Sequence, residues 1–289
     1  MRNQETVLNE LLNWANSKKN IRAVVMTSSR ANPKASIDIF SDYDIELIVT
    51  RLPDFSKNDK WIFHFGNPIA DIKERNKKSL TQLVLYSDGV RIDFQLYTVS
   101  EFIRETKQSL LPEHWDIGYK VLLDKGGITQ MLPWPKNAVY NISRPTEKEF
   151  TSLVKDFWWD TTYVAKSLWR DEIFYAKYIF ESLIHNEYLK RMIEWYIGSK
   201  NNWMVNTNKY GRWFKRYLDN ETWSQIEETF ADSSIEKNWE SLFATTRLFN
   251  RIATEVARQS NYEYSFTLEK NIIEYLKKIQ RLKKNATHF

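Results

Sequence analysis

Two segments in the first hundred residues place apolar side chains at every second position. They are residues 42–49 and 90–97, and as strands each would have one apolar face and one polar face. The polar faces carry acidic residues, which are Asp42, Asp44 and Glu46 in the first segment and Asp93 in the second. If the two strands are sheet neighbours, their apolar faces join one core. The carboxylates of Asp42, Asp44 and Asp93 then converge on the opposite surface.

The remaining pattern of the first half predicts a mixed sheet with flanking helices. Apolar runs predict two more strands, and helical spacing predicts three helices. The strands are residues 22–28 and 80–86, and the helices are residues 6–17, 54–65 and 100–107. Gly89 supplies the turn of a hairpin between residues 80–86 and 90–97. The charged residues 73–78 are expected to form an exposed loop.

Helical periodicity replaces alternation in the second half. Residues 149–170 repeat apolar side chains at i, i+3, i+4 and i+7, as in a long amphipathic helix. Further helices are predicted over residues 173–197, 210–218, 222–230, 236–259 and 268–282. Three prolines and two glycines between residues 126 and 145 indicate a domain boundary. The sequence therefore predicts an α+β protein with a sheet domain, residues 1–135, a helical bundle, residues 136–289, and a cleft between them.

Composition limits the cellular compartment and the classes of binding partner that are expected. The 289-residue chain has no cysteine and no N-terminal apolar leader. It has no apolar run near the ~20 residues that cross a bilayer, so a cytoplasmic protein is expected. The formal net charge is +5, but basic residues are scattered except near the C-terminus, so nucleic-acid binding is not expected. The four histidines lack metal-ligand spacing, and no glycine-rich nucleotide-binding fingerprint is present.

The converging carboxylates indicate a phosphoryl-transfer site. Carboxylates crowded together repel one another unless cations neutralise them. Two Mg²⁺ ions would do so, and such a pair can hold the attacking and leaving oxygens of an in-line displacement. The turn at Ser28 and Ser29 offers hydroxyls and backbone N–H groups to phosphates. A plainer interpretation makes the D-x-D pair a solvated strand edge or a turn, and pairs Asp93 with Arg91 or with a surface lysine.

These residues resemble the nucleotidyltransferase superfamily, whose pattern is a small residue with Ser-Arg, a spacer, D-x-D and an isolated Asp on a later strand. Longer segments resemble the aminoglycoside 6-adenylyltransferases, also called streptomycin adenylyltransferases. They include IRAVVMTSSRANP, FSDYDIELIV, DGVRIDFQL, DFWWDTTYVAKSLWRDE and NKYGRWFKRYL. The likeness runs from about residue 2 to about residue 260 of the chain.

The resemblance implies roles for the first-half residues. Asp42 and Asp44 would hold Mg²⁺, and Asp93 would be a further metal ligand or the general base. The phosphates of ATP would be gripped by the turn residues Ser28, Ser29 and Arg30. The family's turn usually has glycine where this chain has Ser28, and glycine lets a backbone approach phosphate without a Cβ.

The second half is expected to bind the acceptor. By the same resemblance, Lys209 would reach across the cleft to the triphosphate, and Lys166 is a second lysine of that kind. A cationic acceptor is best recognised by carboxylates and aromatic faces. One predicted helix supplies both, in Asp156, Trp158, Trp159, Asp160 and Tyr163. Helical rotation cannot place all five on one face, so some of them belong to the core.

The activity implied by the resemblance is Mg²⁺-dependent transfer of AMP from ATP to a hydroxyl of an aminoglycoside. The 6-hydroxyl of streptomycin is the expected acceptor, and the modified drug would no longer inhibit the ribosome. A monomer is expected. Two alternatives stay open, an enzyme of the same fold that adds AMP to another acceptor such as a protein, and a non-catalytic nucleotide sensor.

Overall fold

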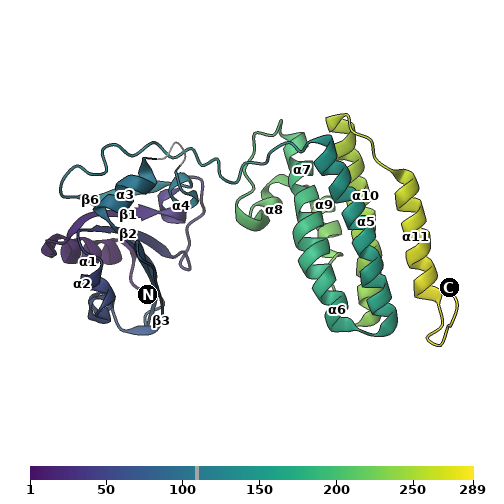
Figure 1. The fold of residues 1–289 in the computed structure, drawn as a ribbon, viewed down its shortest axis with the longest axis horizontal. Coiled ribbons are helices and arrows are strands. Elements are labelled where there is room, and N and C mark those ends of the chain that lie inside the picture. Colours follow the sequence, from purple (N-terminus) through teal and green to yellow (C-terminus); the bar gives the residue numbers. More distant parts are fainter. Residues whose placement is uncertain (108–110) are drawn as a thin grey trace. The chain divides into compact units, whose positions relative to one another are not determined.

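The computed structural model describes residues 1–107 and 111–289, which divide into two compact units, Met1–Val139 and Tyr140–Phe289 (Figure 1). The first unit is built around a sheet and the second is helical, so the predicted α+β class is confirmed. Within the described ranges, none of the helices combines the length and the apolar character needed to cross a membrane.

The first unit contains a six-stranded sheet with the order β3-β4-β5-β2-β1-β6. Its strands are β1 (Ile21–Thr27), β2 (Tyr43–Val49), β3 (Pro68–Arg75), β4 (Ser79–Tyr86), β5 (Arg91–Thr98) and β6 (Tyr119–Asp124). β2 pairs with β5 in parallel, and the other neighbours are antiparallel. The predicted adjacency of the two alternating segments is confirmed.

Helices cover both faces of this sheet. They are α1 (Gln4–Ser17), α2 (Pro53–Ser56), the 3₁₀ segment η2 (Asp59–Phe65), α3 (Val99–Thr106) and α4 (Glu113–Asp116). The odd-numbered apolar positions of β2 pack against α1, α2 and η2, where Trp14 stacks on Trp61 with ring centroids 5.7 Å apart. On the other face, Ile48 packs against Phe102 of α3 and Trp115 of α4. The acidic positions of β2 share this second face, next to its smaller core.

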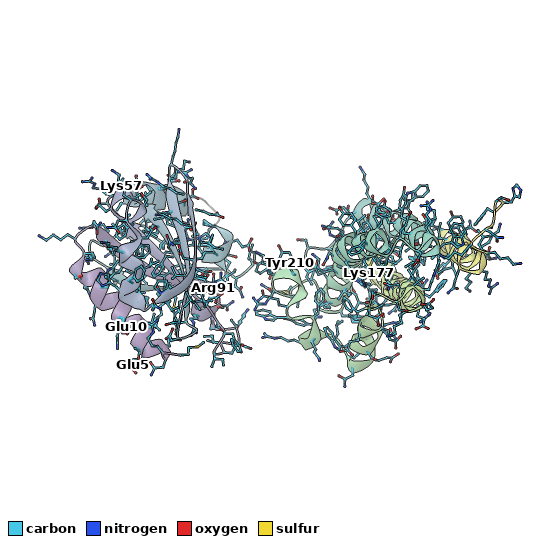
Figure 2. The ribbon with its side chains drawn as sticks, turned by 90° about the horizontal axis from the view of Figure 1, so that it is seen from below. Glu5, Glu10, Lys57, Arg91, Lys177 and Tyr210 are labelled. Carbon is cyan, nitrogen blue, oxygen red and sulfur yellow. The ribbon has the colours of Figure 1, made fainter. Side chains whose placement is uncertain are left out.

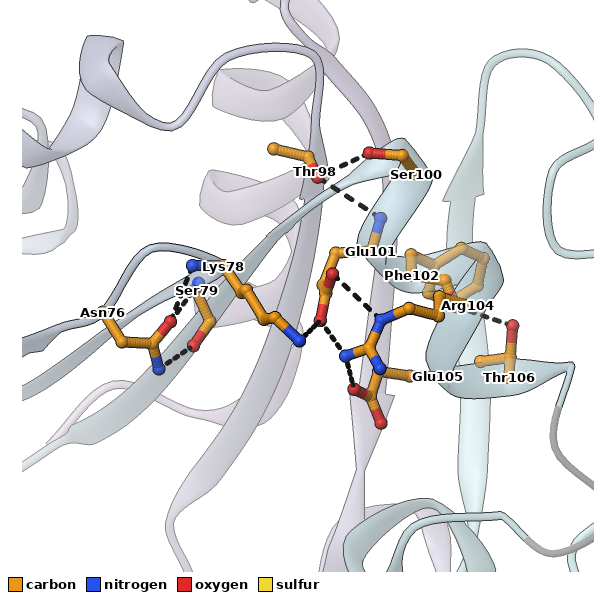
Figure 3. A network of polar contacts seen from close by, with 10 residues as sticks. All are labelled: Asn76, Lys78, Ser79, Thr98, Ser100, Glu101, Phe102, Arg104, Glu105 and Thr106. Carbon is orange, nitrogen blue, oxygen red and sulfur yellow. Dashed lines mark hydrogen bonds and ion pairs between the residues drawn. The ribbon is translucent and has the colours of Figure 1, made fainter.

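A capping contact starts α3 directly after β5. The Oγ1 of Thr98 accepts a hydrogen bond of 3.3 Å from the backbone N–H of Glu101 (Figure 3). The carboxylate of Glu101 pairs with Arg104 on the same helix and lies 3.8 Å from the Nζ of Lys78. These contacts fix the end of the strand that carries Asp93.

The second unit is a bundle of long and short helices. They are α5 (Glu147–Arg170), α6 (Ile173–Tyr178), the π-helix η3 (Ile179–Leu189), α7 (Lys190–Lys200), η4 (Lys209–Gly211), α8 (Phe214–Tyr217), α9 (Asn220–Glu227), α10 (Ile235–Ser260) and α11 (Phe266–Arg281). Thr146 and Glu149 form a capping box at the start of α5. In the core, the ring of Phe157 on α5 stacks on Phe249 of α10 at 3.5 Å.

Several predicted boundaries were wrong. The first half of the expected loop at 73–78 lies in β3, an edge strand that is exposed on both faces and so shows no alternation. The expected helix over 54–65 is the short α2 followed by a 3₁₀ segment. The expected helix over 173–197 contains the π-helical segment η3. The strand β6 has no alternating pattern that would identify it as a strand.

Candidate active site

Two acidic side chains meet where the parallel strands β2 and β5 pair. Asp44 on β2 lies directly opposite Asp93 on β5 in the strand register. β1 ends beside them, and its last residue is followed by the 3₁₀ turn η1 (Ser28–Ala31), in which Ser29 is half-buried. The side chain of Ser28 lines the same cavity as Asp44 and favours the charged form of its carboxyl group. The serine turn and the acidic pair are therefore neighbours, although 13 or more residues separate each from the next along the chain.

Ser28 has a strained backbone. Its φ is +59°, in the left-handed region that favours glycine. The resemblance places glycine at this position, whereas this chain adopts the left-handed conformation with a serine. The serine side chain lies near Asp44 and lowers the pKa of its carboxyl group.

A cavity of about 360 Å³ opens at this position. Its lining includes Thr27, Ser28, Asp44, Glu46, Asp93, Tyr97 and His114. Burial raises the pKa of Asp44 from 3.8 to about 6, and the charges of Asp93 and Asp42 add to the effect. The ionised form of Asp44 is therefore costly unless a cation lies close to it.

Arg91 supplies part of that charge (labelled in Figure 2). Its Nε and Nη2 donate to the two carboxylate oxygens of Asp93 at 2.8 and 2.7 Å. Its Nη1 lies 3.7 Å from an oxygen of Asp42. The plainer interpretation of Asp93, a strand aspartate paired with Arg91, describes this contact, and Arg91 also joins Asp93 to Asp42.

Glu46 is a further carboxyl group of this cavity to which sequence analysis gave no role. Its Oε1 accepts a hydrogen bond of 3.3 Å from Thr27, and the Nε2 of His114 is 3.6 Å away. Among the described residues, its Oε2 is buried and has no hydrogen-bond partner. Burial is the main reason that the pKa of Glu46 is raised to about 8. The alternation of residues 42–49 put Glu46 on the acidic face, which was the available signal.

The carboxylates suit a divalent cation. Mg²⁺ prefers carboxylate oxygens together with substrate phosphates, and a cation would offset the shortage of positive charge at Asp44. In the part of the chain that the structure describes, no three side chains of the His, Cys, Asp or Glu type are grouped to hold a metal ion. Both oxygens of Asp93 are instead engaged by Arg91. The roles of Asp42, Asp44 and Asp93 as cation ligands stay predictions.

Arg30 lies beside the D-x-D strand, and its predicted contact with phosphates stays a prediction. Its guanidinium donates to the carbonyl oxygens of Ser41 and Asp42 at 2.8 to 3.2 Å and to Oε1 of Gln4 at 2.8 Å. It also lies 3.9 Å above the ring of Tyr43. All its nitrogens are used within the first unit, so Arg30 fixes the entry to the D-x-D strand.

Trp158 requires a correction as an acceptor-binding residue. It is fully buried in the helical core, and its indole N–H donates to the hydroxyl of Tyr264 at 3.2 Å. The next residue, Trp159, is 63% exposed and donates to the hydroxyl of Tyr163 at 3.4 Å. Consecutive helical residues differ by about 100° in direction, so one tryptophan enters the core and the other faces outward.

The other predicted residues of α5 share the outward side with Trp159. Asp156 is exposed, Asp160 is half-buried, and the Nζ of Lys166 lies 4.4 Å from the ring centroid of Tyr163. The hydroxyl of Tyr188, from the π-helix η3, donates to Asp160 at 2.6 Å. Tyr188 was missed because its partner is 28 residues away and the sequence gives no sign of a π-helix.

Lys209 lies in the second unit at the start of η4. It is exposed, and its Nζ is 5.4 Å from the ring centroid of Tyr210 (labelled in Figure 2). The contact with the triphosphate stays a prediction.

Comparisons with known proteins agree on one family. The profile of the streptomycin adenylyltransferase family matches residues 1–279. An aminoglycoside 6-adenylyltransferase from Campylobacter jejuni is 33% identical over 279 residues, which is 93% of each chain. One from Bacillus subtilis strain 168 is 30% identical and covers 91% of this chain and 93% of its own. The crystal structure of an aminoglycoside 6-adenyltransferase from Bacillus subtilis aligns with 98% of this chain and 100% of its own, at 27% identity and a TM-score of 0.46. The family profile and the two relatives show that the chain belongs to the streptomycin adenylyltransferase family and is a nucleotidyltransferase.

Proposed function

We propose that this enzyme transfers AMP from ATP to a hydroxyl of an aminoglycoside, the 6-hydroxyl of streptomycin, and thereby gives resistance to the drug. Family membership supports nucleotidyl transfer. The observation that carries the proposal is the parallel pairing of β2 and β5, which sets Asp44 opposite Asp93 beside the serine turn. An acidic pair beside a cavity of about 360 Å³ is an arrangement that suits phosphoryl transfer.

Residues of the first unit are proposed to bind the phosphates and the metal ion and to accept a proton. The turn at Ser28 and Ser29 presents backbone N–H groups and hydroxyls to the phosphates of ATP. Asp42 and Asp44 hold Mg²⁺, which when bound supplies positive charge to the α-phosphate and the leaving pyrophosphate. The acceptor oxygen bonds to the α-phosphorus, the bond from that phosphorus to the bridging oxygen breaks, and pyrophosphate leaves with the electron pair.

Asp93 has two candidate roles in this reaction. It either accepts the proton of the attacking hydroxyl or joins the metal ligands. Each of its oxygens accepts one hydrogen bond from Arg91 and keeps a second lone pair for a proton or a cation. The variant Asp93→Asn separates the roles, since loss of turnover with ATP–Mg²⁺ binding retained supports the base, and loss of both supports the metal ligand.

The second unit is proposed to bind the drug. Trp159 and Tyr163 offer aromatic faces, and Asp156 and Asp160 offer carboxylates to the positively charged groups of streptomycin. Tyr188 holds Asp160 through its 2.6 Å hydrogen bond. We assign residues 1–135 to catalysis and residues 136–289 to acceptor binding, with Lys209 and Lys166 directed to phosphate or drug.

The experiment is release of pyrophosphate from ATP and Mg²⁺, with streptomycin, spectinomycin, kanamycin and lincomycin supplied separately. Streptomycin should support release, its product should gain the mass of AMP, and NMR should place the AMP on the 6-hydroxyl. Asp42→Asn should abolish release, whereas Glu74→Gln, which changes an exposed carboxylate on β3, should leave it intact. Release with another drug only, or with none, would contradict the streptomycin assignment.

A further inference from the structure

Arg91 occupies the position between two carboxylates that a cation would otherwise bridge. Its side chain shares a strand face with Asp93, two residues away, and forms a two-bond fork to it at 2.8 and 2.7 Å. The remaining terminal nitrogen, Nη1, is 3.7 Å from Asp42. One guanidinium therefore contacts both the first and the last of the three predicted acidic residues.

This contact differs from an ordinary surface ion pair. Asp93 is only 19% exposed, and the planar guanidinium matches both carboxylate oxygens, a geometry that lysine cannot provide. The charge of Arg91 also lowers the pKa of Asp44 and so favours the ionised form of that carboxyl group. Without a metal ion, Arg91 is thus the cation that Asp42, Asp44 and Asp93 share.

The shared position has a direct chemical consequence. A divalent cation that binds Asp93 would lie beside the guanidinium, and the two positive charges oppose each other, although each carboxylate oxygen keeps a second lone pair. A guanidinium that turns away from the cation is then available to the phosphate oxygens that accompany it, since arginine binds phosphate in the same two-bond geometry. Arg91 is 43% exposed, so its side chain has room to turn.

We propose that Arg91 is an internal counter-ion that competes with the divalent cation for Asp93 and Asp42. The inference rests on the proposed metal site. In the absence of metal the guanidinium holds the acidic cluster together, and entry of the cation exchanges its carboxylate partner for phosphate. Metal binding without nucleotide is therefore weakened, and nucleotide favours it by giving Arg91 a new partner.

The test measures binding of Mn²⁺ alone, without ATP or drug, from the electron paramagnetic resonance signal of the free ion. Arg91→Gln should bind Mn²⁺ about tenfold or more tightly than the unchanged protein, because a neighbouring charge shifts such equilibria by about that factor. Its melting temperature in EDTA should fall, because the carboxylates lose their counter-ion, and Mn²⁺ should restore it. ATP should tighten Mn²⁺ binding less in the variant.

Two further variants keep the result interpretable. Arg75→Gln removes the same charge from an exposed position on β3 and should leave Mn²⁺ affinity unchanged. Arg91→Lys keeps the charge but loses the fork, so it should fold and show a smaller gain in affinity. Unchanged or weaker Mn²⁺ binding in both Arg91 variants, or an equal gain in Arg75→Gln, would overturn the proposal. Because this readout needs no acceptor, it stands apart from failure of the transfer assay.

Discussion

Asp44→Asn should stabilise the metal-free protein while it abolishes transfer. In the native chain the pKa of Asp44 is raised from 3.8 to about 6, chiefly by burial. At about 1.4 kcal/mol per pKa unit, this rise corresponds to about 3 kcal/mol of native-state free energy lost when the carboxyl ionises. Asparagine has nearly the same shape and carries no charge, so it avoids this loss at neutral pH. The contribution of the Ser28 side chain, which favours the charged form of Asp44, is lost in the variant, so 3 kcal/mol is an upper limit.

The direction in which stability changes with pH follows from the raised pKa of Asp44. Because the folded pKa lies above the unfolded one, the stability linked to protonated Asp44 is fully present below about pH 3.8. It is lost as the pH rises to about 6, and the curve is flat above that. The gap between Asp44→Asn and the unchanged protein should therefore open between about pH 4 and 6 and remain constant to pH 7.

The assay is urea unfolding in EDTA at several pH values, followed by circular dichroism. Glu74→Gln on the exposed strand β3 is the matched control and should follow the unchanged protein throughout. Saturating Mg²⁺ should close the gap, because a ligand stabilises only the form that binds it. Parallel pH profiles for Asp44→Asn and the unchanged protein would refute the argument that Asp44 is ionised at a cost in the absence of metal.

Three further substitutions probe the two units. Ser28→Gly removes backbone strain of about 1–2 kcal/mol but also the hydroxyl near Asp44, so urea unfolding should show little loss at pH 5 and a larger one at pH 8. An equal change at both pH values would contradict this. Glu46→Gln mimics the protonated carboxyl, and its stability advantage should grow from pH 4.5 to about 8, as measured by thermal melts. Trp159→Ala should raise the KM for streptomycin several-fold without affecting stability, whereas Trp158→Ala should lower the free energy of unfolding by about 3–5 kcal/mol. Equal KM values for unchanged protein and Trp159→Ala would remove Trp159 from the acceptor site.

Strand periodicity explains why the acidic face was predictable. A period of two is fixed by the backbone, so Asp42, Asp44 and Glu46 had to share a side once residues 42–49 were a strand. The pairing of β2 with β5 followed because the two segments carried matching apolar faces for one core. Positions governed by local geometry and a large core could be predicted from the sequence.

Side-chain partners were less predictable, because they depend on contacts across the fold. Arg30 and Arg91 are both basic residues near the acidic cluster in sequence, yet one bonds to backbone carbonyls and the other to carboxylates. Likewise the choice of Trp158 or Trp159 for the core depends on the rotation of α5, which is set by packing against α10. Periodicity gave the faces of these elements but not the atoms that each side chain meets.

The local charge balance explains why so acidic a site can exist in a stable fold. Asp42, Asp44 and Asp93 together carry three negative charges when ionised, and Arg91 offsets one of them through its contacts with the first and the last. Burial is the main cause of the raised pKa of Asp44, and the charges of Asp93 and Asp42 add to it. A single divalent cation would complete the balance with Arg91 still in place, whereas a second cation at Asp93 would be opposed by the charge of the adjacent guanidinium. The number of metal ions bound with and without ATP therefore follows from where the Arg91 guanidinium lies.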